Sequence, residues 1–135
     1  MFTPKQIVEK MMAKDNFSHW LGVNVNHINK GTCILSCVIT KEMLNGFEIS
    51  HGGISYSLAD SSLAFAANSY GNKCVSIETS ISHTRPTFLN DKLTATCKEI
   101  NRSKRIGLYE VSITNQDDKL IAYFKGTVSI SEEMW

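Results

Sequence analysis

Apolar residues near the start of the chain recur at helical spacing. The run Thr3-Pro4-Lys5-Gln6 has the form of a capping box with proline in the first helical turn, and it precedes a helical repeat of Ile7, Val8, Met11 and Met12. A second short helix is expected to begin at Asp15 or Asn16 and to end at Gly22. Together these signals make residues 1–20 an N-terminal helical segment.

Most of the remaining chain alternates apolar and polar positions with the period of a β-strand. The strands expected on this basis are residues 23–27, 32–40, 75–82, 93–100, 107–114 and 120–130. The first two flank the hairpin signal Asn29-Lys30-Gly31. In the third, the alternation points Ser76 to the side opposite Val75 and Ile77.

A long helix, predicted over residues 51–69, interrupts the strands and is apolar on most of its surface. It ends in the polar stretch around Gly71. One long helix cannot be hidden between separate layers, whereas an antiparallel sheet wrapped around it buries both. The expected fold class is therefore α+β. Because such a sheet has open edges and leaves the helix partly uncovered, we expect a dimer.

Length, net charge and the lengths of the apolar runs limit the class of protein. A length of 135 residues fits a single domain, residues 1–135, with one core. A formal charge of +1 gives no electrostatic basis for binding nucleic acid or a membrane, and no apolar run approaches the roughly 18 residues of a membrane span. The first residues lack the features of a signal peptide, so we expect a cytoplasmic protein.

The cysteines show no metal-binding spacing. Cys33, Cys37, Cys74 and Cys97 form no C-x-x-C pair, and Cys33 and Cys37 lie on one face of an expected strand. Core packing is the expected role, because a free cysteine behaves as a small hydrophobic residue. No metal site is expected.

The candidate chemistry lies at the start and middle of the long helix. A helix that begins at Gly52 presents free backbone N–H groups and the positive end of its dipole, which can hold a developing oxyanion. Asp60 is a lone carboxylate in otherwise uncharged surroundings, where such a group is paired, shifted in pKa or catalytic. This combination suits hydrolysis of an activated acyl group.

The chain resembles the hotdog-fold acyl-CoA thioesterases of the PaaI type, which are associated with phenylacetic acid degradation. The resemblance rests on four strings: Met43-Leu44-Asn45-Gly46, His51-Gly52-Gly53, Ser57-Leu58-Ala59-Asp60 and Asn68-Ser69-x-Gly71. It continues more loosely from Arg85-Pro86 to Phe124-x-Gly126, and thus covers nearly the whole chain after about residue 20. It implies hydrolysis of acyl-CoA to free acid and CoA, with phenylacetyl or hydroxyphenylacetyl as the expected acyl groups and no metal or cofactor.

The resemblance also implies roles for particular residues. Asp60 matches the catalytic base or nucleophile, the Gly52 N–H matches the group that polarises the thioester carbonyl, and Asn45 matches an amide near the water or carbonyl. His51, Gly53 and Ser76 are expected to be substrate-binding residues.

Several alternatives remain open on the sequence. Asp60 could be a structural carboxylate bonded to Ser57 or Ser61, and Asn45 could only cap its turn. The basic residues Arg102, Lys104 and Arg105 could hold CoA phosphates or form a solvated turn. Two other functions compete: a non-catalytic acyl-CoA-binding module, and a dehydratase of 3-hydroxyacyl thioesters, which would need a histidine paired with a carboxylate.

Helix geometry adds one expectation about assembly. Gly52 and Asp60 are eight residues apart, so they lie about 12 Å apart along the axis of one helix. A base must reach its proton directly or through one water, so the two groups of one chain cannot easily serve one carbonyl. The sequence therefore predicts active sites shared between two antiparallel helices of a homodimer, with pairing into a homotetramer left open.

Overall fold

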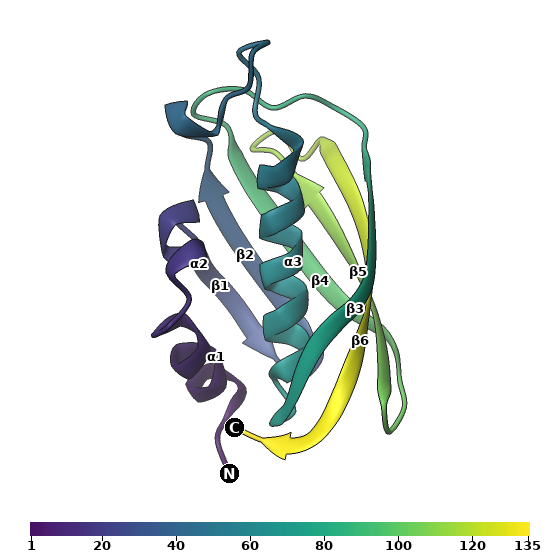
Figure 1. The fold of residues 1–135 in the computed structure, drawn as a ribbon. Helices are drawn as coiled ribbons and strands as arrows, with labels where there is room; N and C mark the ends of the chain where they lie inside the picture. Colours follow the sequence, from purple (N-terminus) through teal and green to yellow (C-terminus); the bar gives the residue numbers. More distant parts are fainter.

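A six-stranded sheet curls around one long helix in the computed structural model, which describes residues 1–135 (Figure 1). The strands lie in the order β1-β2-β4-β5-β6-β3, and every neighbouring pair is antiparallel. The elements in chain order are α1 (Pro4–Met12), α2 (Asn16–Leu21), β1 (Asn24–Asn29), β2 (Thr32–Val38), a 3-10 turn η1 (Lys41–Met43), α3 (Gly52–Asn68), β3 (Asn72–His83), β4 (Lys92–Arg102), β5 (Ile106–Thr114) and β6 (Leu120–Met134).

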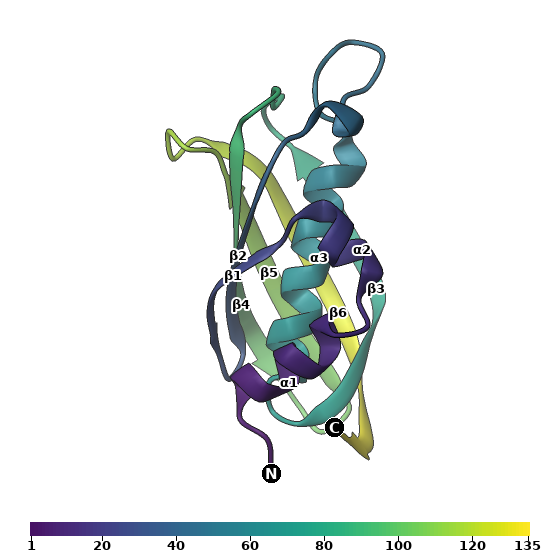
Figure 2. The ribbon, with the colours of Figure 1, turned by 90° about the vertical axis from the view of Figure 1, so that its left-hand side faces the viewer.

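The two short N-terminal helices begin where the sequence predicts them. Thr3 Oγ1 accepts the Gln6 N–H at 3.2 Å while Gln6 Oε1 accepts the Thr3 N–H at 2.9 Å, which completes the capping box of α1. Asp15 caps α2, and Gly22 ends it in the left-handed conformation at φ 74°. Both helices pack against α3, and α1 also contacts β1 (Figure 2).

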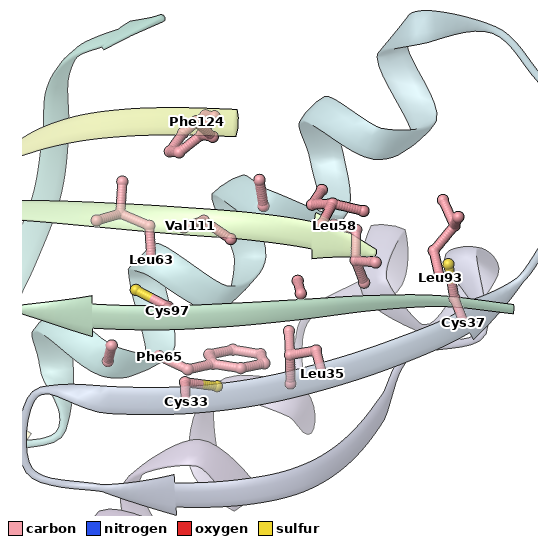
Figure 3. Packing of buried hydrophobic residues seen from close by; sticks show 14 of the residues in the cluster. Cys33, Leu35, Cys37, Leu58, Leu63, Phe65, Leu93, Cys97, Val111 and Phe124 are labelled. Carbon is pink, nitrogen blue, oxygen red and sulfur yellow. The ribbon is translucent and has the colours of Figure 1, made fainter. Parts of the chain in front are cut away.

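The core lies between α3 and the concave face of the sheet. Leu58, Leu63 and Phe65 of α3 are each at most 1% exposed, and they belong to one buried cluster with residues of the central strands (Figure 3). The helix approaches the sheet closely at Gly126, where an added Cβ would lie 2.5 Å from Leu63 Cδ2. Contact at this range explains why β6 carries a glycine facing α3.

Three of the four cysteines belong to this core, as predicted. Cys33, Cys37 and Cys97 are buried, and all four cysteines are free thiols. Burial raises the pKa of the Cys37 thiol to about 11, so the thiol stays protonated and unreactive. Packing is therefore their structural role.

The strand boundaries differ from the prediction mainly at the ends. The strand expected over residues 32–40 stops at Val38 and is followed by the short turn η1. β6 continues to Met134, beyond the expected end at residue 130, because Asn72 at the start of β3 pairs with Met134. A polar strand end of this kind is stabilised by its neighbour rather than by apolar burial, so the alternation of residues does not reveal it.

The two edges of the sheet are β1 and β3. On β3, Val75 is 69% exposed and Ile77 is 58% exposed, next to a backbone edge that pairs with no other strand of this chain. A long edge with exposed apolar residues is a template for pairing with another strand. None of the helices has both the length and the apolar character needed to cross a membrane.

Candidate active site

The start of α3 leaves one backbone amide free. His51 Nδ1 accepts the Gly53 N–H at 2.9 Å, and the His51 carbonyl accepts the Ile54 N–H at 3.0 Å. The Gly52 N–H has no acceptor within the protein, since the first amide of a helix lacks an intrahelical partner. Gly52 is thus the available donor at this helix terminus, and the Gly53 amide is already used by the His51 side chain.

The free amide borders a cavity of about 350 Å³, which we call the Gly52 pocket. Its lining is formed by Asn45, Ile49, Ser50, His51, Gly52, Ser55, His83, Thr84, Arg85, Pro86, Thr87 and Ile121. No carboxylate is among these residues, and Arg85 takes part in none of the ion pairs of the structure. Only two of the lining residues are hydrophobic, and Arg85 brings a positive charge, which suits an anionic or hydrogen-bonding ligand.

Asn45 caps its turn and also lines the Gly52 pocket. Its Oδ1 accepts the Phe47 N–H at 2.9 Å, so the side chain does cap its turn. The Nδ2 group has no protein acceptor, and the residue lines the Gly52 pocket. The structure thus brings Asn45, His51 and Gly52 together, with the amide N–H group of Asn45 left for a ligand.

Asp60 lies in a second, smaller cavity. This Asp60 pocket has a volume of about 240 Å³ and is mostly apolar, lined by Asp60, Leu63, Ala64, Cys74, Val75, Ser76 and Val128. Partial burial away from water raises the pKa of the Asp60 carboxyl above its ordinary value. Ser76, expected beside the substrate, lies in the same pocket as Asp60.

The two serines considered as structural partners of Asp60 bond elsewhere. Ser57 Oγ donates to the Gly53 carbonyl at 2.7 Å, and Ser61 Oγ lies 3.0 Å from Ser18 Oγ on α2. The alternative of a carboxylate held by one of these hydroxyls is therefore wrong. Asp60 therefore remains a half-buried acid whose side-chain carboxylate forms no hydrogen bond to the rest of the chain.

The predicted site residues thus fall into two groups on one chain. The first group surrounds the start of α3, and the second lies about two turns further along the same helix. Gly53 lines neither cavity. The separation between the groups is what the eight-residue spacing of Gly52 and Asp60 requires.

Sequence reasoning missed two features of the Gly52 pocket, Ser55 and the contacts of His83. His83 is the last residue of β3, and its Nε2 lies 3.0 Å from Ser55 Oγ and 3.2 Å from the Gly52 carbonyl oxygen. No spacing in the sequence indicates this contact, because it joins residues 31 apart through the packing of β3 on α3.

One of the basic residues near the turn between β4 and β5, Arg102 at the end of β4, has a structural role. Arg102 Nη1 donates to the Ala67 carbonyl and to the Tyr109 hydroxyl, both at 3.2 Å, and its guanidinium lies 4.0 Å from the centre of the Tyr70 ring. Arg102 therefore secures the end of α3 and is a poor candidate for holding a phosphate.

The structure contains no group of three or more His, Cys, Asp or Glu side chains arranged to hold a metal ion.

Comparison with known proteins decides the family. A family model described as the thioesterase superfamily matches residues 47–122, which is more than half of the chain and includes all of α3. The chain belongs to this superfamily. This thioesterase is 36% identical, over 121 residues, to acyl-coenzyme A thioesterase PaaI of Escherichia coli (strain K12), covering 90% of the chain and 86% of the relative.

Solved structures agree with the sequence relatives. The thioesterase superposes on the E. coli PaaI protein from the phenylacetic acid degradation operon with a TM-score of 0.95, at 33% identity, over 97% of this chain and 95% of that one. A mutant of the phenylacetic acid degradation protein PaaI from Thermus thermophilus matches with a TM-score of 0.82 at 32% identity, over 85% and 98% of the two chains.

These findings confirm the PaaI-type resemblance, the hotdog fold and the prediction of a thioesterase enzyme. The competing prediction of a non-catalytic module loses its basis, because the relatives of this thioesterase are enzymes by name. The individual roles of Asp60, Gly52, Asn45, His51, Gly53 and Ser76 stay predictions.

Proposed function

We propose that this thioesterase hydrolyses acyl-CoA to the free acid and CoA, with Asp60 as general base or nucleophile and the Gly52 N–H as donor to the carbonyl oxygen. The main observation behind the proposal is the environment of the Asp60 side-chain carboxylate. This half-buried carboxylate forms no hydrogen bond or ion pair in a mostly apolar pocket, and desolvation raises its pKa, which is typical of a catalytic group. The free Gly52 amide supplies the complementary group.

The proposed reaction follows from these two groups. As a base, Asp60 takes a proton from water while the water oxygen attacks the thioester carbonyl carbon. The carbonyl oxygen becomes an oxyanion that accepts the Gly52 N–H at the positive end of α3. The C–S bond then breaks, and the CoA thiolate leaves and takes up a proton. As a nucleophile, the Asp60 carboxylate would itself attack the carbonyl carbon, the C–S bond would break, and the CoA thiolate would leave and take up a proton. Water would then hydrolyse the resulting mixed anhydride to the free acid and regenerate the carboxylate.

We place Gly52 and Asp60 of one reaction on two different subunits. About 12 Å along a single helix separates them, which is too far for both to act on one carbonyl. Two α3 helices packed antiparallel across a two-fold axis would set the start of each against the middle of the other. The exposed apolar edge of β3, next to Ser76 of the Asp60 pocket, supports an interface on this side of the molecule.

The proposed acyl group is an aryl-acetyl group such as phenylacetyl or hydroxyphenylacetyl. Two similar structures carry phenylacetic acid degradation in their names. The small apolar Asp60 pocket supports a compact apolar acyl group, while the positively charged Gly52 pocket supports the CoA portion with its phosphates. A thiol-release screen over aryl-acetyl, benzoyl and straight-chain CoA esters tests this, and a clear preference for straight chains would contradict it.

Asp60→Asn tests the catalytic assignment. The amide has nearly the shape of the carboxylate, so the variant is expected to fold and to bind acyl-CoA, while kcat falls by at least about 10²-fold. Asp117→Asn, in the exposed turn before β6, is the matched control and should keep full activity. A folded Asp60→Asn enzyme with near-normal turnover would end the assignment.

Mixed dimers test the shared site. A chain with Asp60→Asn is combined with a chain carrying Asn45→Ala, so that each homodimer has two damaged sites. In the heterodimer, one site carries both changes and the other carries neither. Activity should recover toward half of the wild-type value per heterodimer. Purified heterodimers as inactive as both parents would show that each chain builds its own site.

A further inference from the structure

Three polar atoms meet behind the free amide of Gly52. The Gly52 carbonyl oxygen lies 3.1 Å from Ser55 Oγ and 3.2 Å from His83 Nε2, and these two side-chain atoms are 3.0 Å apart. Ser55 comes from the first turn of α3 and His83 from the end of β3. The cluster therefore ties the beginning of the helix to the sheet.

The chemistry of the three atoms fixes the direction of their hydrogen bonds. A carbonyl oxygen only accepts, and the Ser55 hydroxyl donates its one proton to it. His83 Nε2 must then carry a hydrogen of its own, because otherwise it would face the carbonyl oxygen with a lone pair at 3.2 Å. The imidazole therefore donates toward Ser55 Oγ and the Gly52 oxygen.

With these bonds, both peptide groups beside Gly52, His51–Gly52 and Gly52–Gly53, are held by hydrogen bonds. The preceding plane is held by the bond from the Ile54 N–H to the His51 carbonyl. The following plane is held at its oxygen by Ser55 and His83, and at its N–H by His51 Nδ1. Without such anchors, two consecutive glycines would give this backbone unusual freedom.

We propose that His83, acting with Ser55, is a positioning residue that aims the Gly52 N–H at the thioester oxygen. This inference rests on the proposed role of Gly52 as the carbonyl donor. A preorganised donor is worth more to the transition state than one that must be ordered in each catalytic cycle. His83 does not touch the reacting atoms in this scheme; it acts through the backbone of Gly52.

The shape of the contact supports the same role. A Cβ added to Gly52 would lie 3.2 Å from His83 Cε1 and 3.4 Å from His83 Nε2, so the imidazole packs directly on the Cα of this residue. The ring thereby restrains Gly52 by contact as well as by hydrogen bonding. It also gives a reason why residue 52 is a glycine although its φ lies outside the left-handed region.

A nucleophilic Ser55 activated by His83 fits the geometry less well. Ser55 is only 4% exposed, its proton is given to the Gly52 carbonyl, and no carboxylate bonds to His83 to orient it as in a catalytic triad. Mass spectrometry of the enzyme during turnover distinguishes the two roles, because acylated Ser55 would overturn the positioning role.

Kinetics of His83→Leu and His83→Gln test the proposal. His83→Leu removes the donor, and we expect kcat to fall about tenfold with little change in KM, because the Gly52 bond strengthens in the transition state. His83→Gln retains an N–H donor and should recover most of the loss. His27→Leu, on the opposite edge strand, is the control. Unchanged kcat in His83→Leu, a change in KM alone, or an equal loss in His83→Gln would each overturn the proposal.

A measurement without substrate separates this inference from the proposed function. In ¹⁵N relaxation, the Gly52 amide of the wild type is expected to have the order parameter of a rigid backbone, about 0.85, and to fall below that value in His83→Leu. If no acyl-CoA is hydrolysed, the proposed function fails while this result still decides the role of His83. A Gly52 amide equally rigid in both proteins would overturn it.

Discussion

Asn68 Oδ1 accepts the indole N–H of Trp135 at 2.8 Å, which links the last turn of α3 to a residue 67 positions later. The same Oδ1 accepts the Cys74 N–H at 2.9 Å, while Nδ2 donates to the carbonyls of Ala64 and Cys74. Asn68 is 1% exposed, and its four side-chain hydrogen bonds are at least partly buried. One side chain thus joins the end of α3, the start of β3 and the residue after β6.

Asn68→Ala is expected to destabilise the fold by about 3 kcal/mol, because it leaves buried backbone groups without partners. Trp135→Phe removes only one donor and should destabilise by about 1 kcal/mol. Urea unfolding measures both values, with the exposed Asn26→Ala as control. Equal effects of the Asn68 and Asn26 changes would show that this junction contributes little.

Gly126→Ala is expected to lower stability by about 2 kcal/mol, since its Cβ would lie 2.5 Å from Leu63 Cδ2. Leu63→Ala alone leaves a cavity and is also destabilising. In the double variant the new methyl group has room, so the combined effect should be smaller than the sum of the two. Thermal unfolding of the four proteins gives the coupling, and strict additivity would mean that β6 moves away from α3 instead.

Asp60→Asn should make the protein more stable at neutral pH. Burial raises the pKa of Asp60 above its ordinary value of 3.8, so the folded state holds this proton more tightly than the unfolded chain. The favourable contribution of protonated Asp60 to the free energy of unfolding is complete below pH 3.8, and it is lost as the pH rises through the pKa of Asp60 in the folded state. The stability difference between the variant and the wild type should therefore grow with pH and vanish in acid, as denaturant melts across pH would show.

The same shift predicts the acid limb of the activity profile. A base or nucleophile must be ionised, so activity should fall as the pH drops through the pKa of Asp60, at a midpoint above 3.8. The pH dependence of kcat/KM measures this midpoint in the free enzyme. A limb at or below the ordinary aspartate value would contradict the assignment of the limb to a desolvated Asp60.

Two arginines should respond differently to removal. Arg85 lines the Gly52 pocket and forms no ion pair, so Arg85→Gln is expected to raise KM for acyl-CoA about tenfold with kcat retained. Arg102→Gln should instead lower the melting temperature, because Arg102 bonds to Ala67 and Tyr109. Steady-state kinetics and thermal unfolding of both variants measure these effects. A raised KM in Arg102→Gln with an unchanged KM in Arg85→Gln would contradict the prediction.

Local signals in the sequence explain which parts of the fold were predictable. The capping box at Thr3, the left-handed Gly22 and the apolar helix that begins at Gly52 each depend on residues within a few positions of one another. The end of β6 depends on Asn72 opposite Met134, and the contact of His83 with Gly52 depends on how β3 packs against α3. Such pairings depend on the tertiary structure, so the periodicity of apolar residues in the sequence does not predict them.

The candidate site divides in the same way. The helix start and the lone carboxylate at Asp60 are visible as types of residue in an unusual setting, and the helical rise sets their separation. The sequence does not show that His51 takes up the Gly53 amide, which leaves Gly52 as the free donor. It also does not exclude Ser57 and Ser61 as partners of Asp60, since hydroxyl directions depend on the surrounding carbonyls and on α2.

The position of β3 at the sheet edge has a consequence for how the chain is made. β3 pairs only with β6, and residues 84–119 lie between the end of one strand and the beginning of the other. During synthesis from the N-terminus, α3 and β3 therefore emerge before the strand that joins them to the rest of the sheet. Until β6 has been made, the side of α3 that β6 covers stays open to solvent, and during this interval the nascent chain is exposed to misassociation.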